Sequence, residues 1–269
     1  PSRKIDLHRR IEQVGELPTL PHVVQKLASM IGRPNVSAEE IGTLIEKDQV
    51  LSAKVLRLAN SPFYGFPSRI ASVAHAVVVL GLNVVKGLTL CATAFDMMRN
   101  AGMNELWRHS LGVAMTAHIL GTKAAMKNPE EVFVAGLLHD IGKSLIDPSI
   151  LNCKGKLTLE QWEEMKRHPV LGCRILDGHS GINAAALEVV RYHHEKVNRS
   201  GYPEQCDAKA LSPLIRICTI ADIFDALTTK RSYKDAVSTF EALKIMKNEM
   251  AEQLDADLLQ TFIKMMGAP

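Results

Sequence analysis

The sequence has few of the features that mark secreted proteins. It contains five cysteines, an odd number, and no two of them stand at CxxC spacing. This indicates a reducing compartment, the cytoplasm, in which the cysteines act as small apolar packing residues. No secretory signal is present, and because the chain begins at Pro1 rather than Met we expect it to be a piece of a longer protein.

Clustered positive charge and long apolar runs are also lacking. The formal net charge is +3 and the basic residues are scattered, which argues against a nucleic-acid or membrane partner. The longest apolar stretch, Ala71–Phe95, is interrupted by His75, Asn83 and Lys86. A membrane span needs about 20 apolar residues in a row. The stretch therefore predicts buried core helices.

Alternating apolar and polar runs, which mark strands, are missing as well. Helical spacing of apolar residues recurs instead, and this predicts an all-α fold. Ser37 and Glu40 form a capping box that starts one helix. The other helices are expected at Pro18–Met30, Asp48–Ala59, Ile70–Leu80, Val84–Met98, 105–126, 130–142, 160–176, 182–195, 211–228, 238–250 and 255–266. The character of the sequence changes near Arg99, and from Asn104 onward histidines and acids appear inside the helical patterns, which predicts an N-terminal helical subdomain at 1–98 and a second domain at 99–269.

Several phrases in the N-terminal half carry a family resemblance. Leu17–Pro21, Ile45–Leu51, Leu58–Gly65 and Ile70–Gly81 occur in an order that resembles the HDOD family over roughly residues 15–98. The resemblance implies a bacterial signalling output module, with a signalling protein partner engaged through this half. Many members of that family lack the metal ligands of true HD enzymes.

Three residues within this resemblance invite a functional interpretation. Asp48, Asn60 and Tyr64 could form a ligand surface. Helix capping and turn formation is the favoured alternative, since Asn and Ser before a proline commonly end helices.

A histidine and a carboxylate interrupt an apolar helix in the C-terminal half. His139 and Asp140 stand in Gly-Leu-Leu-His-Asp-Ile-Gly-Lys, which resembles the HD phosphohydrolase signature. Burying this pair is costly unless it is compensated, and a divalent cation compensates it better than a simple hydrogen bond between the two. Glu105 and His109 are four residues apart, so they share one helix face and can reach one ion, unless they form an ordinary exposed pair.

The order of the later polar residues resembles the HD-GYP subgroup over about residues 104–250. Gly201-Tyr202-Pro203 follows the pair His193-His194, and Ala221–Thr228 then precedes Arg231. The resemblance implies an HD-domain-type helical bundle. It implies the metal ligands Glu105, His109, His139, Asp140, His168, His193, His194 and Asp222. It also implies catalytic roles for Lys143, Asp140 and Arg231, and substrate contacts from Lys143, Arg231 and Lys234.

One loop departs from that subgroup. Asn198-Arg199 stands where HD-GYP proteins usually have Asp-Gly. The change alters the charge of the loop and removes a glycine. It bears on substrate contacts and on the partner surface rather than on the metal ligands.

The implied ligand set is too large for one ion. A single site uses about four to six ligands, so two or three divalent ions are expected. Imidazoles mixed with carboxylates suit iron or manganese first, with zinc or nickel as alternatives. Asp225, one turn after Asp222, is expected to orient Lys143 or a ligand histidine from behind, or else to form a plain salt bridge. His118, other remaining histidines, Trp107 and Trp162 are interpreted as core or surface residues, both tryptophans as packing anchors.

Three functions remain open from the sequence. The first is a metal-dependent phosphodiesterase acting on a cyclic dinucleotide such as cyclic di-GMP. The second is a non-catalytic signalling module with a structural or sensory metal site. The third is an HD-type hydrolase of another nucleotide. The expected partners are a small phosphodiester or nucleotide ligand and a signalling protein that engages the N-terminal half.

Overall fold

The structure is a computed structural model of the 269-residue chain. It describes residues 36–60, 64, 66–82, 84–85, 89, 104–153, 155–177, 182–229 and 236–267. Every regular element within these residues is a helix and none is a strand, which confirms the all-α prediction. The chain divides into two compact units, Pro1–Leu80 and Gly81–Pro269.

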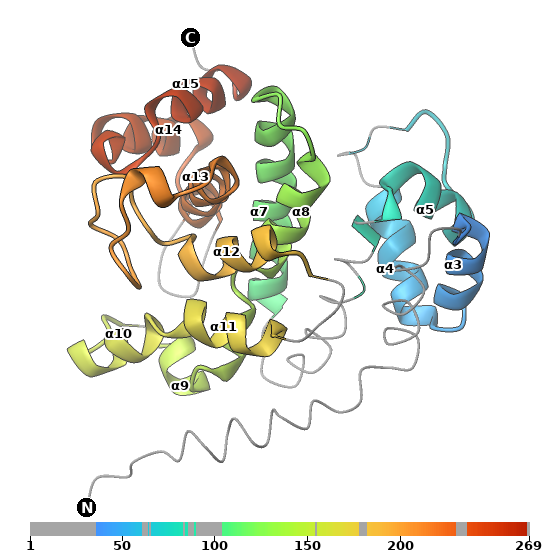
Figure 1. The fold of residues 1–269 in the computed structure, drawn as a ribbon, viewed down its shortest axis with the longest axis horizontal. Coiled ribbons are helices and arrows are strands. Elements are labelled where there is room, and N and C mark those ends of the chain that lie inside the picture. The colour runs from blue at the N-terminus through green and yellow to red at the C-terminus, as the bar shows by residue number, and fades with distance from the viewer. Residues whose placement is uncertain are drawn as a thin grey trace, which may run out of the picture. The chain divides into compact units, whose positions relative to one another are not determined.

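The first unit contains three described helices, α3 (Ala38–Ile45), α4 (Gln49–Ala59) and α5 (Val73–Leu80) (Figure 1). The predicted capping box is confirmed: Ser37 Oγ accepts from the Glu40 amide at 3.1 Å, and the Glu40 carboxylate accepts from the Ser37 amide at 3.1 Å. Ile41 and Ile45 of α3 and Val55 of α4 are fully buried between the helices. The three helices thus enclose a small core of their own.

Side chains at helix ends of this unit serve the backbone. The Asp48 carboxylate accepts from the Leu51 amide at 3.0 Å, which caps α4. The Asn60 amide group donates to the Ile70 carbonyl and accepts from the Ile70 amide, each at 2.8 Å. These bonds tie the end of α4 to the segment before α5. The capping and turn interpretation is therefore confirmed for Asp48 and Asn60.

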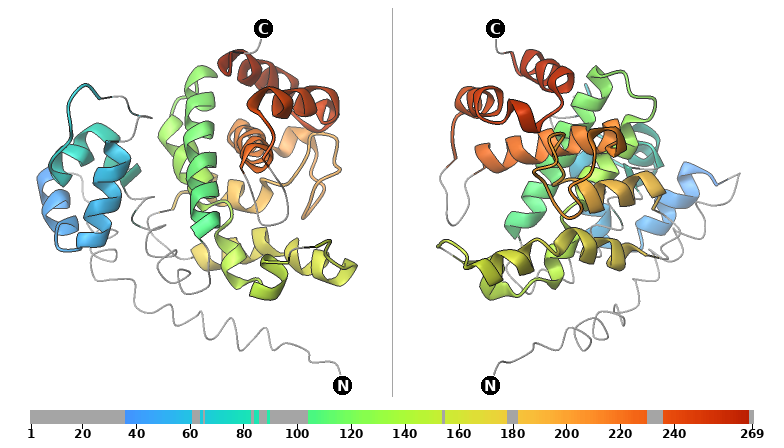
Figure 2. Two further views of the ribbon diagram at one scale, coloured as in Figure 1. Left: turned by 180° about the vertical axis from the view of Figure 1, so that it is seen from behind. Right: turned by 60° about the vertical axis from the view of Figure 1, so that its left-hand side comes forward.

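The second unit is a larger helical bundle. The long helix α7 (Asn104–Lys123) lies alongside α8 (Pro129–Leu138) and α13 (Pro213–Thr228), as both views of Figure 2 show. The remaining elements are α9 (Pro148–Leu151), α10 (Leu159–Met165), α11 (His168–Leu176), α12 (Ala184–Tyr192), α14 (Thr239–Asn248), α15 (Ala256–Met265) and the 3-10 segments η2 (Ile141–Leu145), η3 (Ala208–Ala210) and η4 (Ala251–Gln253). Val113, Val132 and Ile217 meet in the core between the three central helices.

Two predicted helices end earlier than expected, and both breaks lie at polar residues of interest. The predicted helix 130–142 was wrong beyond Leu138, where α8 ends and the chain turns through His139 into η2. The predicted continuous helix 160–176 was also wrong, since α10 ends at Met165 and α11 begins at His168. Pro169 lacks the amide hydrogen that would continue the helix, and so it starts a new one.

Other expectations lie outside the described residues. The helix predicted at Pro18–Met30 falls wholly there, and the one at Val84–Met98 does so for most of its length. The division near Leu80 lies upstream of the domain boundary expected at residue 98, which stays a prediction. Within the described part, no helix combines the length and hydropathy that a membrane span requires.

Gly142 allows η2 and α11 to touch through their backbones. A Cβ at this position would lie 1.9 Å from the His168 carbonyl oxygen and 2.5 Å from the Gly172 amide nitrogen. Real Cβ atoms do not come so close, so only glycine fits without a backbone shift. This contact brings the residues around Asp140 against the start of α11.

We expect Gly142→Ala to destabilise the second unit by about 1–3 kcal/mol, since the added methyl must push two backbones apart. Gly155→Ala is the matched control, because a Cβ there meets nothing within 4 Å. Urea unfolding followed by circular dichroism measures both. Equal stability of the two variants would contradict the close-contact interpretation.

Candidate metal centre

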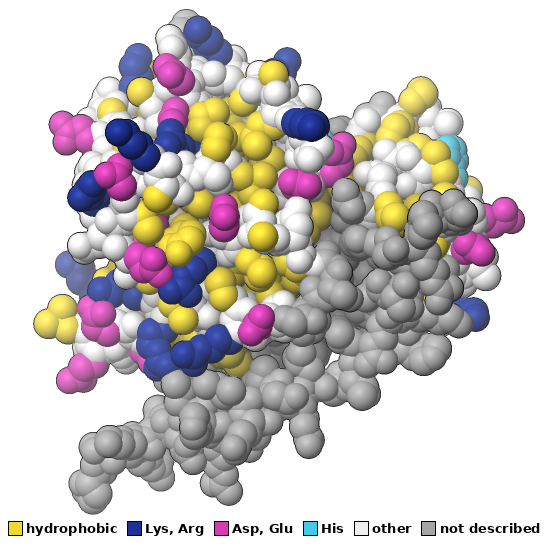
Figure 3. Space-filling view, viewed as in Figure 1, with side chains coloured by type: hydrophobic (Ala, Val, Ile, Leu, Met, Phe, Trp, Pro, Cys, Tyr) yellow, Lys and Arg dark blue, Asp and Glu magenta, His cyan; other side chains and the backbone are white. Residues whose placement is uncertain are grey.

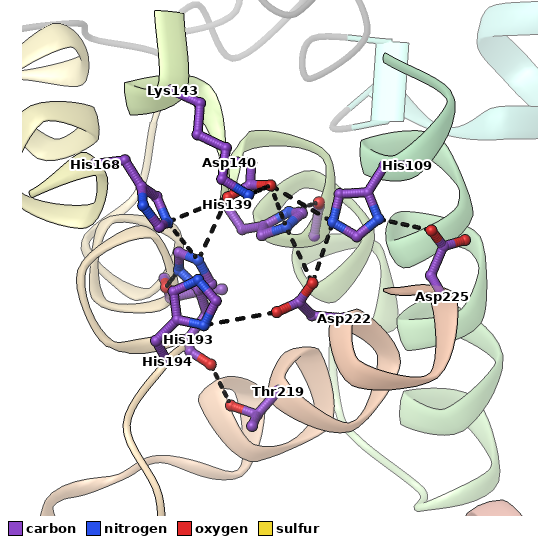
Figure 4. A network of polar contacts seen from close by, with 12 residues as sticks. His109, His139, Asp140, Lys143, His168, His193, His194, Thr219, Asp222 and Asp225 are labelled. Carbon is purple, nitrogen blue, oxygen red and sulfur yellow. Dashed lines mark hydrogen bonds and ion pairs between the residues drawn. The ribbon is translucent and has the colours of Figure 1, made fainter. Parts of the chain in front are cut away.

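Seven of the eight predicted metal ligands converge in the second unit (Figure 4). They form two groups, in each of which the donor atoms lie within 4.8 Å of one another: Asp140, His168, His193 and His194 in the first, and His109, His139 and Asp222 in the second. All but His194 are buried. The donors come from α7, α11 and α13, from the segment joining α8 to η2, and from the end of α12.

The carboxylate of Asp140 contacts both groups. Its Oδ1 lies 3.2 Å from His168 Nε2 and 3.7 Å from His193 Nε2. Its Oδ2 lies 3.4 Å from His139 Nε2 and 3.5 Å from His109 Nε2. One carboxylate therefore presents one oxygen to each group and joins the two.

Asp222 spans the two groups in the same way from the opposite side. Its Oδ1 lies 3.1 Å from His109 Nε2 and 3.8 Å from His139 Nε2. Its Oδ2 lies 3.8 Å from His194 Nδ1. The two groups are thus two halves of one centre joined by two carboxylates, as Figure 4 shows.

Backbone carbonyls fix the orientation of three of the histidine rings. Nδ1 lies 2.7 Å from the Gly136 carbonyl in His139, 2.8 Å from the Met165 carbonyl in His168, and 3.0 Å from the Val190 carbonyl in His193. A carbonyl only accepts, so each Nδ1 carries the hydrogen and each Nε2 keeps a lone pair. The lone pairs point into the centre, where a cation can use them.

The His168-Pro169 pair shows how the sequence builds this bond. In a continuous helix the amide of residue 169 would donate to the Met165 carbonyl, but proline has no such hydrogen. The imidazole of His168 donates to that carbonyl instead, at 2.8 Å. The same proline that breaks the helix thus leaves an acceptor that holds the ligand ring.

His109 is held by a carboxylate rather than a carbonyl. Its Nδ1 lies 2.6 Å from Asp225 Oδ2, and its Nε2 faces Asp222 and Asp140. Burial opposes charging of this ring, but the hydrogen bonds to Asp222 and Asp225 outweigh it and raise the pKa of His109. Asp225 lies behind the ring, where a carboxylate that orients a ligand histidine belongs.

The electrostatics of the centre favour anionic Asp140 and Asp222 and neutral His193 and His194. Burial opposes ionisation of Asp140, yet Lys143 and His139 hold its pKa well below the usual range. Asp222 behaves likewise, with burial outweighed by His109 and His194. Burial lowers the pKa of His193 to about 4 and also lowers the pKa of His194. For these four side chains, the favoured protonation states are those in which carboxylates and imidazoles bind metal.

The donor set fits divalent ions. Both Nδ1 atoms donate to carbonyls, so the Nε2 atoms of His168 and His193, which lie 3.3 Å apart, face each other with their lone pairs. His139 Nε2 and Asp140 Oδ1 are buried and make no hydrogen bond of normal geometry. Converging buried lone pairs repel each other unless a cation lies between them. Mixed imidazole and carboxylate donors suit transition metals better than Mg²⁺ or Ca²⁺.

Other predicted site residues differ in where they lie. Glu105 is exposed in the first turn of α7 and belongs to neither donor group, so the structure does not bring it to the centre. Lys143 lies at the centre, with its Nζ 2.5 Å from Asp140 Oδ2. Arg231 and Lys234, the predicted substrate contacts, lie outside the described residues.

Sequence reasoning missed the role of Glu195. Its buried carboxylate accepts three backbone amides, from Glu204 at 2.6 Å, Gln205 at 2.9 Å and Cys206 at 3.0 Å. These bonds fold the 198–206 loop back onto the end of α12. From the sequence, an acidic residue directly after two histidines suggests another ligand or a surface charge. Only the fold shows that Glu195 anchors a loop.

Asn198-Arg199, which stands where HD-GYP proteins usually have Asp-Gly, still forms a turn. Asn198 Oδ1 accepts from the Ser200 amide at 3.1 Å, as an aspartate can. Arg199 adopts a φ of 63°, a left-handed conformation that costs a non-glycine residue roughly 1–2 kcal/mol. Gly201 is needed for packing, since a Cβ there would lie 2.4 Å from the His194 carbonyl oxygen. The loop is therefore built despite the strained arginine.

Tyr202 covers the centre, and Trp162 lies beyond it. The Tyr202 ring stacks on His194, with centroids 4.6 Å apart and an interplanar angle of 27°. Burial, followed by the charges of Asp140 and Asp222, raises the pKa of Tyr202. The Trp162 ring stands edge-on to Tyr202 at 6.2 Å and is 44% exposed. The prediction that Trp162 is a packing anchor was wrong.

Comparison with known families agrees with the N-terminal resemblance and extends it. The model of the HDOD domain matches residues 17–194, and the chain therefore belongs to the HDOD family. The fold is similar to that of a crystal structure of an HDOD domain protein with unknown function from Geobacter sulfurreducens, with a TM-score of 0.60 at 24% identity over 96% of this chain and 93% of that one.

Curated relatives extend the similarity to named enzymes. The chain is 33% identical over 163 residues to a cyclic di-GMP phosphodiesterase of Pseudomonas aeruginosa, covering 60% of this chain and 39% of the relative. It is 32% identical over 172 residues to a 3′3′-cGAMP-specific phosphodiesterase of Vibrio cholerae, covering 63% of this chain and 37% of the relative. The chain thus spans well under half the length of these two relatives.

We expect His109→Gln to lower the metal content of the purified protein by about one equivalent, because His109 supplies a donor that only its half of the centre can use. His118→Gln is the matched control on the same helix, since His118 contacts the Pro129 carbonyl and belongs to neither donor group. Elemental analysis measures the metal per chain. The same metal content in both variants would count against the centre.

We expect Asp225→Asn to weaken metal affinity about 10- to 100-fold without removing a donor, because it loosens the His109 ring. Competition with a chelator of known affinity measures the change. Asp255→Asn controls for loss of a carboxylate elsewhere in the unit, where Asp255 pairs with Arg216 at 2.6 Å. An unchanged affinity in Asp225→Asn would show that the 2.6 Å contact with His109 does not orient a ligand.

Proposed function

We propose that this chain is a metal-dependent phosphodiesterase of the HD superfamily that hydrolyses a cyclic dinucleotide in bacterial signalling. The observation that carries the proposal is the pair of buried donor groups joined by Asp140 and Asp222, with Lys143 beside them. Relatives named as cyclic di-GMP and 3′3′-cGAMP phosphodiesterases support the substrate class.

Two or three divalent ions, iron or manganese first, fit this proposal. The donor groups number two, and each has the mixture of nitrogen and oxygen ligands that such ions accept. Bound metal would supply Lewis-acid chemistry, activating water and neutralising charge on phosphoryl oxygens. Because only Asp140 and Asp222 bring negative charge among the grouped residues, two divalent ions would leave the centre net positive and attractive to a phosphodiester.

Lys143 is the described side chain best suited to hold the substrate. Its Nζ lies at Asp140 Oδ2, and its side chain retains 14% exposure, so the amine borders both the centre and solvent. An ammonium there can bind a phosphoryl oxygen and stabilise the charge that develops on it during in-line attack. Asp140 would act by bridging the donor groups and positioning Lys143. Arg231 and Lys234 remain predicted contacts for the same phosphate.

The HD-GYP-like character of the C-terminal half is part of the proposal. The converging ligands, the loop that carries Gly201-Tyr202-Pro203, and the stacking of Tyr202 on His194 support it. The proposed assignment of residues 99–269 as one metal-binding domain is supported by the same features, since every grouped donor lies in that range.

We expect the manganese- or iron-loaded protein to hydrolyse cyclic di-GMP or 3′3′-cGAMP. Lys143→Ala should lower kcat about 10²- to 10³-fold, because a charge-assisted contact made in the transition state is lost. Lys244→Ala removes a comparable amine from an exposed pair on α14 and should leave kcat unchanged. Chromatography of the nucleotide products gives the rates.

The outcome that contradicts the proposed activity requires that metal is bound. If the protein retains two or more equivalents of metal and turns over neither dinucleotide with manganese, iron, zinc or nickel, the proposed activity is wrong. Hydrolysis of a different nucleotide under the same conditions would instead identify an HD-type hydrolase of another substrate.

A second candidate is a non-catalytic signalling module with a sensory or structural metal site. The HDOD match to residues 17–194 favours it, as does the first unit, whose described helices would engage a protein partner. In that case the metal-loaded protein binds a nucleotide or partner without turnover. Metal removal then changes partner binding but no reaction rate.

A further inference from the structure

An exposed tryptophan stands at the rim of the candidate metal centre. Trp162 lies on α10 and is 44% exposed, although large aromatic side chains are normally buried. Figure 3 shows hydrophobic side chains at the surface around the α10 end of this unit, among acidic and basic ones. The side chain adds little to the core, so its position needs another explanation.

A chain of ring contacts connects Trp162 to the metal ligands. Trp162 stands edge-on to Tyr202, with ring centroids 6.2 Å apart and an interplanar angle of 76°. Tyr202 stacks on His194 at 4.6 Å and stands edge-on to His168 at 6.3 Å. Two successive ring contacts thus separate the donor groups from the tryptophan. A nucleobase could reach Trp162 while its phosphate lies at the donor groups.

Tyr202 is held firmly enough to define this rim. Glu195 binds the amides of Glu204 and Gln205 just after it, and Gly201 packs against the backbone of His194 just before it. The tyrosine lies between the ligand histidines and Trp162, and the tryptophan keeps 44% of its surface exposed beside this contact. Exposed indole surface of this kind can accept a flat aromatic partner by stacking.

The charges around Trp162 favour an uncharged partner. Lys166 pairs with Glu163 at 2.6 Å, and Arg167 pairs with Glu164 at 2.7 Å. The basic side chains at the end of α10 are therefore already compensated and offer little to a second phosphate. The rim suits a nucleobase, while the donor groups and Lys143 suit the phosphodiester.

We propose that Trp162 is a specificity-determining residue that stacks on a nucleobase of the substrate. This rests on the proposed phosphodiesterase function and names the part of the substrate that the metal centre itself does not recognise. Stacking is tolerant of base identity, since every base has a π-face. Trp162 would therefore select nucleotides over simple phosphodiesters rather than one base over another.

Turnover tests the proposal with Trp162→Ala in the metal-loaded protein. The expected result is a roughly 5- to 100-fold increase in KM for cyclic di-GMP or 3′3′-cGAMP with kcat nearly unchanged, because stacking holds the base and not the reacting bond. Trp162→Phe should recover most of the loss. Phe240→Ala, which removes an aromatic side chain 67% exposed on α14, should have no effect.

Binding tests it without relying on catalysis. Either dinucleotide should quench the tryptophan emission of the wild-type protein, and Trp162→Phe should abolish that quenching, since only Trp107 then emits. Quenching without turnover would contradict the proposed activity and support the stacking site. Turnover with an unchanged KM in Trp162→Ala would contradict the stacking site and support the proposed activity.

Leu159 separates a base-stacking site from a general apolar surface. It is 84% exposed and three residues before Trp162, so it lies on the same side of α10. Leu159→Ala should leave KM and quenching unchanged. An effect as large as that of Trp162→Ala, or the absence of any quenching in the wild-type protein, would overturn the proposal and favour a protein partner on this helix.

Discussion

The hydrogen bond from an imidazole Nδ1 to a backbone carbonyl is the interaction on which the centre depends. His139 and His193 stand at the ends of α8 and α12, and His168 follows the end of α10. Each ring donates to a carbonyl in the last turn of the helix that precedes it, where carbonyls lack a partner further along the helix. This bond uses a carbonyl at a helix end, fixes the tautomer and directs a lone pair inward. The positions of these three histidines therefore follow from where the helices end.

Burial makes this arrangement unstable without compensation. Asp140 and Asp222 are buried among rings whose lone pairs converge, and a charge in such a place is tolerated only when it is paired. Lys143 and His109 provide part of the pairing from the protein itself. Each aspartate contacts both donor groups instead of one, and this pairing offsets part of the cost of burying its charge.

The sequence predicted the helical fold and most ligands because both depend on local pattern. The spacing of apolar residues indicates a helix. A polar residue inside an otherwise apolar helix, such as Asp222, indicates a site. Glu105 has the right spacing from His109 but lies on the exposed side of α7, which spacing alone cannot distinguish. Glu195, Tyr202 and Trp162 escaped prediction because their roles depend on a loop folding back across many residues, and no local pattern encodes that return.

Family membership and completeness of the centre are separate properties of this chain. The HDOD match ends at residue 194, so it includes six of the grouped donors but neither Asp222 nor Asp225. The Gly201-Tyr202-Pro203 loop also lies beyond it. Without α13, Asp140 would be the sole bridging carboxylate and His109 would lose its partner. Asp222, which completes the second donor group, and Asp225, which holds the His109 ring, therefore lie in the C-terminal continuation of the match, whereas Lys143 and the other grouped donors lie within it.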